Sequence, residues 1–325
     1  MINQLRWGFI GNGWIAKVLA EDFKIAGLKI QAIGARNQAK ADEFADTYGI
    51  PNRHDSYEKL VNDPEVDIVY VATPHPFHVR DAVLALNSGK HVLCEKPFTI
   101  NEKEAVQIKE AANRNNRFVM EAMWARFLPG QNELQKIIKS GAIGKVRIVI
   151  ADHTRYLVDI RRLWDPELGG GALLDLGVYP IHLIVRLLGI PTKIESSAKL
   201  SSENIDEYLM CKMDFADGGM ATFLTTNSVA GANRATIYGE KGRVEVEGSA
   251  WDGTNFSLFN QAGDFISKYQ ENHPGTGRQF QALEVERCIR EGLLESPQLQ
   301  VDETIAIMRI MDQIRNQICV KYPME

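Results

Sequence analysis

The chain of 325 residues is too long for one small core, so roughly two domains are expected. Its composition, 45% hydrophobic and 24% charged, is that of a folded globular protein and excludes long disordered stretches. The net charge of −5 gives no electrostatic reason to expect nucleic acid or an anionic membrane surface as a partner.

The cysteines and the apolar segments predict the compartment. Four cysteines lie far apart without a C-x-x-C pair, which favours a reducing cytoplasm and predicts no metal site. The amino terminus lacks the basic and apolar regions of a signal peptide. The most apolar window, Leu173 to Ile190, is interrupted by Asp175, His182 and Arg186, so we expect no transmembrane span and a cytoplasmic protein.

The first 120 residues alternate short apolar runs with helical patterns. The strand-like runs are Leu5–Ile10, Leu28–Gly34, Val66–Ala72, His91–Cys94 and Phe118–Glu121. The segments with helical periodicity are Ile15–Lys24, Gln38–Tyr48, Pro76–Ser88 and Asn101–Asn113. Strands separated by helices of this length predict a parallel sheet covered on both faces, in a first domain over residues 1–123.

After Gly144 the pattern changes to alternating apolar and polar residues. Segments such as "KVRIVIADHTR" and "ATIYGEKGRVEVEG" are joined by turn signals, which is typical of antiparallel strands with one covered face. Two helical segments, Thr276–Glu291 and Asp302–Ile318, follow. We therefore expect a second domain, residues 124–325, that contains an antiparallel sheet with one covered face.

The stretch "WGFIGNGWIA" follows the first strand and opens the first helix. Gly11 permits a tight turn, Gly13 lets the backbone approach a pyrophosphate, and Ala16 keeps the helix close to the strand. The amino end of the helix offers unpaired N–H groups to phosphates. The residues predicted to contact the cofactor here are Gly11, Asn12, Gly13, Trp14 and Ile15.

The end of the second strand bears on the choice of dinucleotide. NAD sites usually carry an acid there, whereas "KIQAIGARNQAK" has Arg36 and, one turn later, Lys40. A guanidinium can bind a 2′-phosphate and stack on the adenine, so we predict NADP(H) in preference to NAD(H). The alternative is an exposed loop arginine, with the 2′-hydroxyl bound by a backbone group.

Two further segments follow strands and should line the same edge of the sheet. Glu95 and Lys96 of "EKP" follow the fourth predicted strand, and Lys96 is a candidate for binding a substrate hydroxyl. The alternative is a surface lysine paired with a glutamate. In "ATPHPFH", Thr73 and Pro74 are expected against the cofactor, and His78 either beside it or as a packing residue.

Together, GNGWIA, ATPHPFH, EKP and GGGALLDLGVYPIH resemble the Gfo/Idh/MocA oxidoreductases over nearly the whole chain, most of all the dimeric dihydrodiol dehydrogenase and xylose dehydrogenase branch. The resemblance implies catalytic roles for Lys96, Asp175 and Tyr179, with Tyr179 as the acid/base residue. It also implies an α/β protein with a Rossmann dinucleotide-binding domain over residues 1–123. The domain over residues 124–325 would then carry a large, mostly antiparallel open sheet, bind the substrate and form a homodimer through that sheet. His182 is a departure, because inositol dehydrogenase-like members often have aspartate at that position.

The residues of this stretch also favour proton-transfer chemistry. Asp175, Tyr179 and His182 lie at i, i+4 and i+7 and are expected on one helix face, with a kink at Pro180. Alcohol oxidation needs a base, and tyrosine, whose reference pKa is about 10, acts as one near neutrality only beside a positive charge, for which Lys96 is the candidate. The alternative is a core tyrosine bonded to a backbone carbonyl.

The sequence thus predicts an NADP(H)-dependent oxidoreductase acting on a secondary alcohol or carbonyl of a small polyhydroxylated substrate, such as a sugar. Trp124, Arg126 and His182 are the candidate substrate-binding residues. The alternatives are a reductase of dihydrodiols, dicarbonyls or a biliverdin-like compound, and a non-catalytic NADP-sensing regulator.

Overall fold

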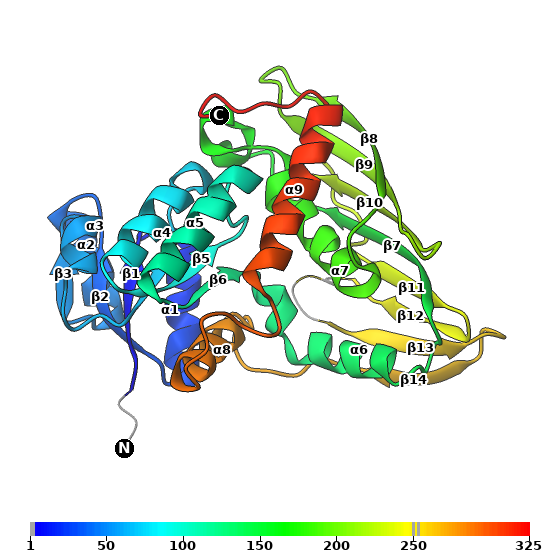
Figure 1. Ribbon diagram of the computed structural model, residues 1–325, viewed down its shortest axis with the longest axis horizontal. Helices are drawn as coiled ribbons and strands as arrows, with labels where there is room; N and C mark the ends of the chain where they lie inside the picture. The colour runs from blue at the N-terminus through cyan, green and yellow to red at the C-terminus, as the bar shows by residue number, and fades with distance from the viewer. Residues whose placement is uncertain (1–3, 249–250, 252–253) are drawn as a thin grey trace. The chain divides into compact units, whose positions relative to one another are not determined.

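The computed structural model describes residues 4–248, 251 and 254–325 (Figure 1). The chain forms two compact units. The first comprises Met1–Trp124 and Pro274–Met308, and the second comprises Ala125–His273 and Arg309–Glu325.

A six-stranded parallel sheet forms the centre of the first unit. Its strands are β1 (Arg6–Ile10), β2 (Lys29–Gly34), β3 (Asn52–His54), β4 (Ile68–Val71), β5 (His91–Glu95) and β6 (Val119–Ala122). Their order is β3-β2-β1-β4-β5-β6, and every neighbouring pair is parallel. The predicted Rossmann sheet is confirmed, with the short strand β3 added at its edge.

The helices of this unit are connections between its strands, apart from the last one. They are α1 (Trp14–Ala26), α2 (Gln38–Tyr48), α3 (Tyr57–Val61), the 3-10 turn η1 (His75–Phe77), α4 (His78–Asn87), α5 (Glu102–Asn115) and α8 (Gln279–Arg290). Side-chain oxygens of Asn37, Ser56 and Asn101 accept from backbone N–H groups and fix where three of these helices begin.

Aromatic side chains fill the core between this sheet and α1. Phe23 makes edge-to-face contacts with Trp7 and Phe9, at ring-centroid distances of 5.1 and 5.3 Å, and Phe9 contacts Tyr70 at 4.9 Å. All four side chains are fully buried. Because each such ring contributes about 1.5–3 kcal/mol by burial alone, this cluster is a main source of the unit's stability.

A segment from the carboxyl-terminal part of the chain completes the first unit, which differs from the predicted division at residue 123. The indole of Trp7 donates to Glu286 of α8 at 3.0 Å. Asp22 of α1 accepts from the backbone N–H and hydroxyl of Thr276 at 2.9 and 2.6 Å, and from the N–H of Arg278 at 2.8 Å. These bonds join α8 to β1, and the residues just before α8 to α1.

The second unit is built on an eight-stranded sheet. The strands are β7 (Val146–Thr154), β8 (Lys193–Leu200), β9 (Asp206–Asp214), β10 (Met220–Thr226), β11 (Ala235–Gly239), β12 (Gly242–Val246), β13 (Phe256–Asn260) and β14 (Phe265–Tyr269). Their order is β14-β13-β12-β11-β7-β10-β9-β8, and only the β7–β10 pair is parallel. This confirms the predicted, mostly antiparallel sheet.

One face of this sheet is covered and the other is open. Helix α7 (Val178–Leu188) packs on β7, as Figure 1 shows. Along β7, Val149 and Ala151 are buried while Ile148 and Ile150 are 41% and 46% exposed. The remaining helical segments of the chain are η2 (Trp124–Phe127), α6 (Pro129–Lys139), η3 (Arg161–Trp164), η4 (Pro166–Leu168), η5 (Leu173–Gly177) and α9 (Val301–Gln317).

The helical irregularity that was expected at Pro180 lies earlier. Leu173–Gly177 forms a π-helical turn that leads directly into α7. Pro180 has no N–H to donate to the carbonyl oxygen of Leu176 four residues earlier, and that oxygen lies 3.0 Å from His153 Nδ1 instead. The stretch Pro166–Leu188 is long and apolar enough to cross a membrane, but 83% of its most apolar window is buried, as in the core helix of a globular protein.

Candidate functional site

The turn after β1 has the geometry of a phosphate cradle. Gly11 adopts a φ of +96°, and a Cβ there would lie 2.8 Å from the carbonyl oxygen of Ala72. A Cβ on Gly13 would meet no atom within 4 Å, so the space beside this backbone is open. Gly11 is therefore required by the turn itself, whereas Gly13 leaves room for a group outside the chain.

The amino end of α1 and a neighbouring loop offer groups suited to a dinucleotide. Gly13 caps α1 without a side-chain hydrogen bond, and the first turn has no acidic residue, so its N–H groups suit a pyrophosphate. The hydroxyl of Thr73 is buried and, within the described part of the chain, has no hydrogen-bond partner. The residues present therefore fit an NAD(P) cofactor, whose phosphates and nicotinamide end they would hold. Trp14 is 70% exposed at this helix end.

Arg36 stands where the sequence predicts a contact to the adenosine part of the cofactor. It follows Ala35 at the carboxyl end of β2 and is exposed. Its charge acts on Tyr57 of α3, and Asn37 caps α2 directly after it. An exposed guanidinium at this position can reach a ligand without leaving a buried ion pair.

His78 connects two loops that the sequence assigned to the cofactor site. Its Nδ1 lies 2.9 Å from the carbonyl oxygen of Pro97, and its Nε2 lies 2.8 Å from that of Thr73. Burial lowers its pKa, and a neutral imidazole can donate to only one of these two oxygens. The sequence left His78 either beside the cofactor or as a packing residue. Its ring is fully buried, which is the environment of a packing residue.

Glu95 and Lys96 lie at the end of β5, beside a buried phenol. Tyr70 donates to Glu95 Oε1 at 2.5 Å, and the N–H of Lys96 donates to Glu95 Oε2 at 3.2 Å. Burial raises the pKa of the Glu95 carboxyl, while the Tyr70 bond and the charges of Lys96 and Arg278 lower it. The Lys96–Pro97 peptide bond is cis. Glu95 thus fixes the backbone from which the Lys96 side chain projects.

All predicted cofactor residues of the first unit therefore follow the carboxyl ends of neighbouring strands, at one edge of the sheet. This is the edge at which open α/β sheets bind ligands.

In the second unit, the predicted polar stripe is buried on one helical stretch. Asp175 lies in the π-helical turn, and Tyr179 and His182 lie in α7, with exposed fractions of 5%, 7% and 3%. Arg162 pairs with Asp175 at 3.1 Å.

The structure adds an aromatic cluster around Tyr179 that the sequence did not predict. The ring of His153, from β7, packs edge-to-face on Tyr179 at 4.9 Å, and Trp251 lies 5.4 Å from His153 and 6.2 Å from Tyr179. His153 Nδ1 lies 3.0 Å from the carbonyl oxygen of Leu176. One feature of the sequence could have indicated it: His153 continues the row of β7 residues, Val149 and Ala151, that is otherwise apolar and buried.

Trp124 and Arg126 both lie in the buried turn η2. Trp124 belongs to the first unit, and the guanidinium of Arg278 stacks over its ring at 3.9 Å. Arg126 belongs to the second unit, where Arg186 donates to its carbonyl oxygen at 3.3 Å. No sequence motif marks Arg278, so its position beside Trp124 was not predicted.

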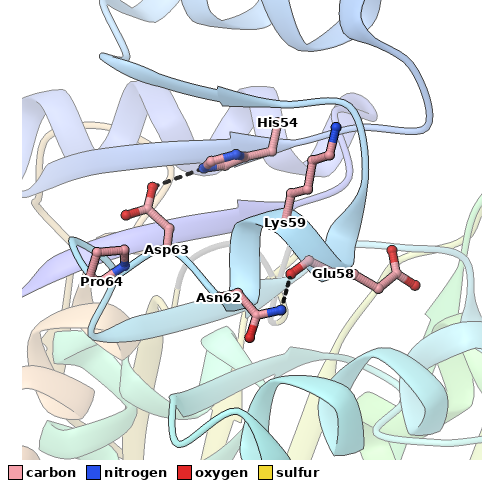
Figure 2. A pocket seen from close by; sticks show the side chains of 6 residues that line it. All are labelled: His54, Glu58, Lys59, Asn62, Asp63 and Pro64. Carbon is pink, nitrogen blue, oxygen red and sulfur yellow. Dashed lines mark hydrogen bonds and ion pairs between the residues drawn. The ribbon is translucent and has the colours of Figure 1, made fainter.

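A surface pocket elsewhere contains none of these residues. Figure 2 shows that it is lined by His54, Glu58, Lys59, Asn62, Asp63 and Pro64, at β3 and α3. His54 bonds to Asp63 at 2.9 Å, and Asp63 also accepts from Asn52 and from the N–H of Glu65. Since its carboxylate is satisfied within the chain, Asp63 has a structural role there.

The sheet, the glycine turn and the open amino end of α1 define a dinucleotide-binding protein of the oxidoreductase class. Residues 5–123 match the family described as "Oxidoreductase family, NAD-binding Rossmann fold", and residues 132–245 match the "GFO/IDH/MocA C-terminal domain". The chain belongs to the GFO/IDH/MocA oxidoreductase family and is an NAD(P)-dependent oxidoreductase acting on alcohol groups.

Relatives with established names extend over the whole chain. Trans-1,2-dihydrobenzene-1,2-diol dehydrogenase of Danio rerio is 35% identical, covering 98% of each chain. Among solved structures, aldose-aldose oxidoreductase of Caulobacter crescentus, complexed with glycerol, is 25% identical with a TM-score of 0.88 over 98% of each chain. Levoglucosan dehydrogenase with NADH and levoglucosan is 19% identical, with a TM-score of 0.88 over 99% of this chain and all of that one, and shares the fold.

Proposed function

We propose that this oxidoreductase uses NADP(H) and transfers hydride to or from a secondary alcohol or carbonyl of a small polyhydroxylated substrate. The observation that carries the proposal is the cradle at Gly11 and Gly13, with Lys96 at the same edge of the sheet, in a chain of this family. A sugar or sugar derivative is the first substrate class, in keeping with the aldose-aldose oxidoreductase that the chain resembles.

Arg36 supports the preference for NADP(H). No acid follows β2, and an exposed guanidinium in its place would bind the 2′-phosphate. The test compares kcat/KM for NADP⁺ and NAD⁺ in the wild type and in Arg36→Ala. We expect the wild type to favour NADP⁺ and the variant to lose at least about tenfold with NADP⁺ alone, the size of one charge-assisted contact. A wild type that prefers NAD⁺ contradicts the proposal.

In the proposed mechanism, a bound nicotinamide would supply the hydride chemistry, and the residues of the chain would handle the proton. Tyr179 takes the proton from the substrate hydroxyl during oxidation and returns it during reduction. Lys96 supplies the positive charge that favours the phenolate and binds the reacting oxygen. Asp175 orients these groups, while Trp124, Arg126 and His182 bind the remainder of the substrate.

The second candidate substrate class is a trans-dihydrodiol, and the relative from Danio rerio favours it. A screen of aldoses, inositols, trans-dihydrodiols and diketones, followed by NADPH absorbance, distinguishes the classes. We expect turnover of at least one aldose. Turnover of dihydrodiols alone would replace the sugar proposal, and tight NADPH binding without turnover of any compound would favour a regulator.

We also propose that the protein forms a homodimer through the open face of the eight-stranded sheet. Exposed apolar side chains gather there in register: Ile148 of β7 pairs with Met220 of β10 and with Tyr238 of β11. Such a surface is typical of an interface. Analytical ultracentrifugation should show a dimer that Ile148→Lys converts to monomer, and a wild-type monomer at micromolar concentration would contradict this.

A cytoplasmic location is part of the same proposal. It is supported by the four cysteines, Cys94, Cys211, Cys288 and Cys319, all of which are free.

A further inference from the structure

Arg278 is an arginine whose backbone is held rigidly in the first unit. It immediately precedes α8, and its N–H donates to the buried carboxylate of Asp22 at 2.8 Å. The same carboxylate holds Thr276 by two bonds, and a Cβ on Gly275 would lie 2.4 Å from its Oδ1. Asp22 therefore fixes the path of the chain just before Arg278.

The Arg278 side chain is held against Trp124 but its donors are not used. The guanidinium carbon lies 3.9 Å from the Trp124 ring centroid, within the range of a cation–π contact. Its Nε is buried, and no residue in the described part of the chain forms a hydrogen bond or ion pair with the group. A partly buried cation with unused donors is costly unless a ligand supplies acceptors.

The place of Arg278 in the sheet indicates which ligand this is. Trp124 follows β6, and Arg278 acts electrostatically on Glu95 at the end of β5 and on Tyr70 of β4. The pyrophosphate cradle follows β1 and Arg36 follows β2, and both strands belong to the other half of the strand order. Arg278 thus belongs to the half of this edge that faces the reacting end of the cofactor and the substrate.

The chemistry of the guanidinium indicates the kind of ligand. Lys96 and Arg278 are the basic groups here, and Glu95 and Glu121 are the buried carboxyls. A planar guanidinium offers paired N–H donors that match the two oxygens of a carboxylate. A neutral hydroxyl offers only one oxygen and no charge.

We propose that Arg278 is a specificity-determining residue that binds a carboxylate group of the substrate, so that sugar acids are preferred over neutral sugars. This inference rests on the proposed function, whose sugar class it narrows. Trp124 supplies the face on which Arg278 is held, and Asp22 acts as a positioning residue through the backbone.

The test measures binding of D-gluconate and D-glucitol to the NADPH-loaded enzyme, by calorimetry or by NADPH fluorescence. The two probes differ only in a carboxylate in place of a hydroxymethyl group. We expect gluconate to bind at least about tenfold more tightly to the wild type, as a charge-assisted bond implies. Arg278→Gln keeps the backbone bond to Asp22 and should abolish the difference, while Arg278→Lys retains part of it.

Arg114→Gln is the matched control, because Arg114 is exposed on α5 and its loss removes the same charge from the same unit. It should keep the wild-type preference. Equal binding of the two probes, or no binding of gluconate at millimolar concentration, overturns the proposal. So does an equal loss of both probes in Arg278→Gln, or weaker NADPH binding by that variant. The binding test does not depend on turnover, so the two proposals can fail separately. Turnover of neutral sugars by an enzyme that shows no preference for gluconate would contradict the role of Arg278 and leave the proposed function intact.

Discussion

Asp206 provides a prediction whose magnitude follows directly from the structure. It lies at the start of β9, is 1% exposed, and accepts from the N–H of Leu173 at 2.6 Å. Its second oxygen has no hydrogen-bond partner among the described residues. A Cβ on Gly171 would lie 2.2 Å from that oxygen. The carboxyl group therefore holds the beginning of the π-helical turn that carries Asp175.

Burial raises the pKa of Asp206 to about 7, from an ordinary value of 3.8. Between these two pH values the folded protein keeps a proton that the unfolded chain has released. Protonation of Asp206 thus contributes stability that is fully present below pH 3.8 and is lost as the pH rises through about 7. From pH 5 to pH 8 the loss is about 3 kcal/mol.

Asp206→Asn removes this dependence, because the amide does not titrate and its oxygen still accepts from Leu173. The melting temperatures of wild type and variant are compared at pH 5 and pH 8 by calorimetry. Relative to the wild type, the variant should gain about 6–12 °C between these pH values, since 1 kcal/mol corresponds to about 2–4 °C in a unit of this size. Asp214→Asn, at the other end of β9, is the control. If the melting temperatures of wild type and Asp206→Asn differ by the same amount at pH 5 and at pH 8, the reasoning is refuted.

Three further outcomes are expected. Gly13→Val adds atoms to open space, so it should leave the melting temperature unchanged and weaken NADPH binding at least about tenfold. Gly11→Ala should lower both the melting temperature and the affinity for NADPH, because residue 11 has a φ of +96° and a Cβ there would contact Ala72. The expected loss of unfolding free energy is about 1–3 kcal/mol. Burial lowers the pKa of His91 to about 4, so as the pH falls the unfolded chain binds a proton at this residue before the folded protein does. The free energy of unfolding should therefore fall by about 2 kcal/mol between pH 6.5 and 4. His91→Gln should reduce that fall, as measured by urea titrations at the two pH values. Asp22→Ala removes three partly buried hydrogen bonds and should lower the free energy of unfolding in urea by about 2–4 kcal/mol, against about 1 kcal/mol for Thr276→Val, which removes one of them. Equal losses would contradict the role of Asp22.

Local signals explain how much of the fold was predictable. Helix α2 was predicted over its observed span, Gln38–Tyr48, because Asn37 caps its start and Gly49, with a φ of 67°, ends it. Strand β3 was missed because Asn52–His54 has no apolar run, and its pairing with β2 alone makes it a strand. The attachment of Pro274–Met308 to the first unit depends on bonds between residues more than 250 positions apart, which no local pattern reveals.

The candidate site was predictable where a residue belongs to a motif. Gly11, Gly13 and Lys96 follow strands, and the topology of a parallel sheet then places them at one edge. His153 and Arg278 carry no such signal. His153 becomes notable because β7 brings it against Tyr179, and Arg278 because Asp22 turns it toward Trp124.

The proton-transfer role of Tyr179 is the central claim, and single-turnover kinetics of Tyr179→Phe test it most directly. With a substrate identified by the screen, the rate of hydride transfer should fall by about 10²–10⁴-fold, the contribution of a positioned acid/base group. The Kd for NADPH should stay at the wild-type value, and Tyr48→Phe, which removes a hydroxyl on α2, should match the wild type in both. A Tyr179→Phe enzyme that retains wild-type hydride transfer would contradict the account.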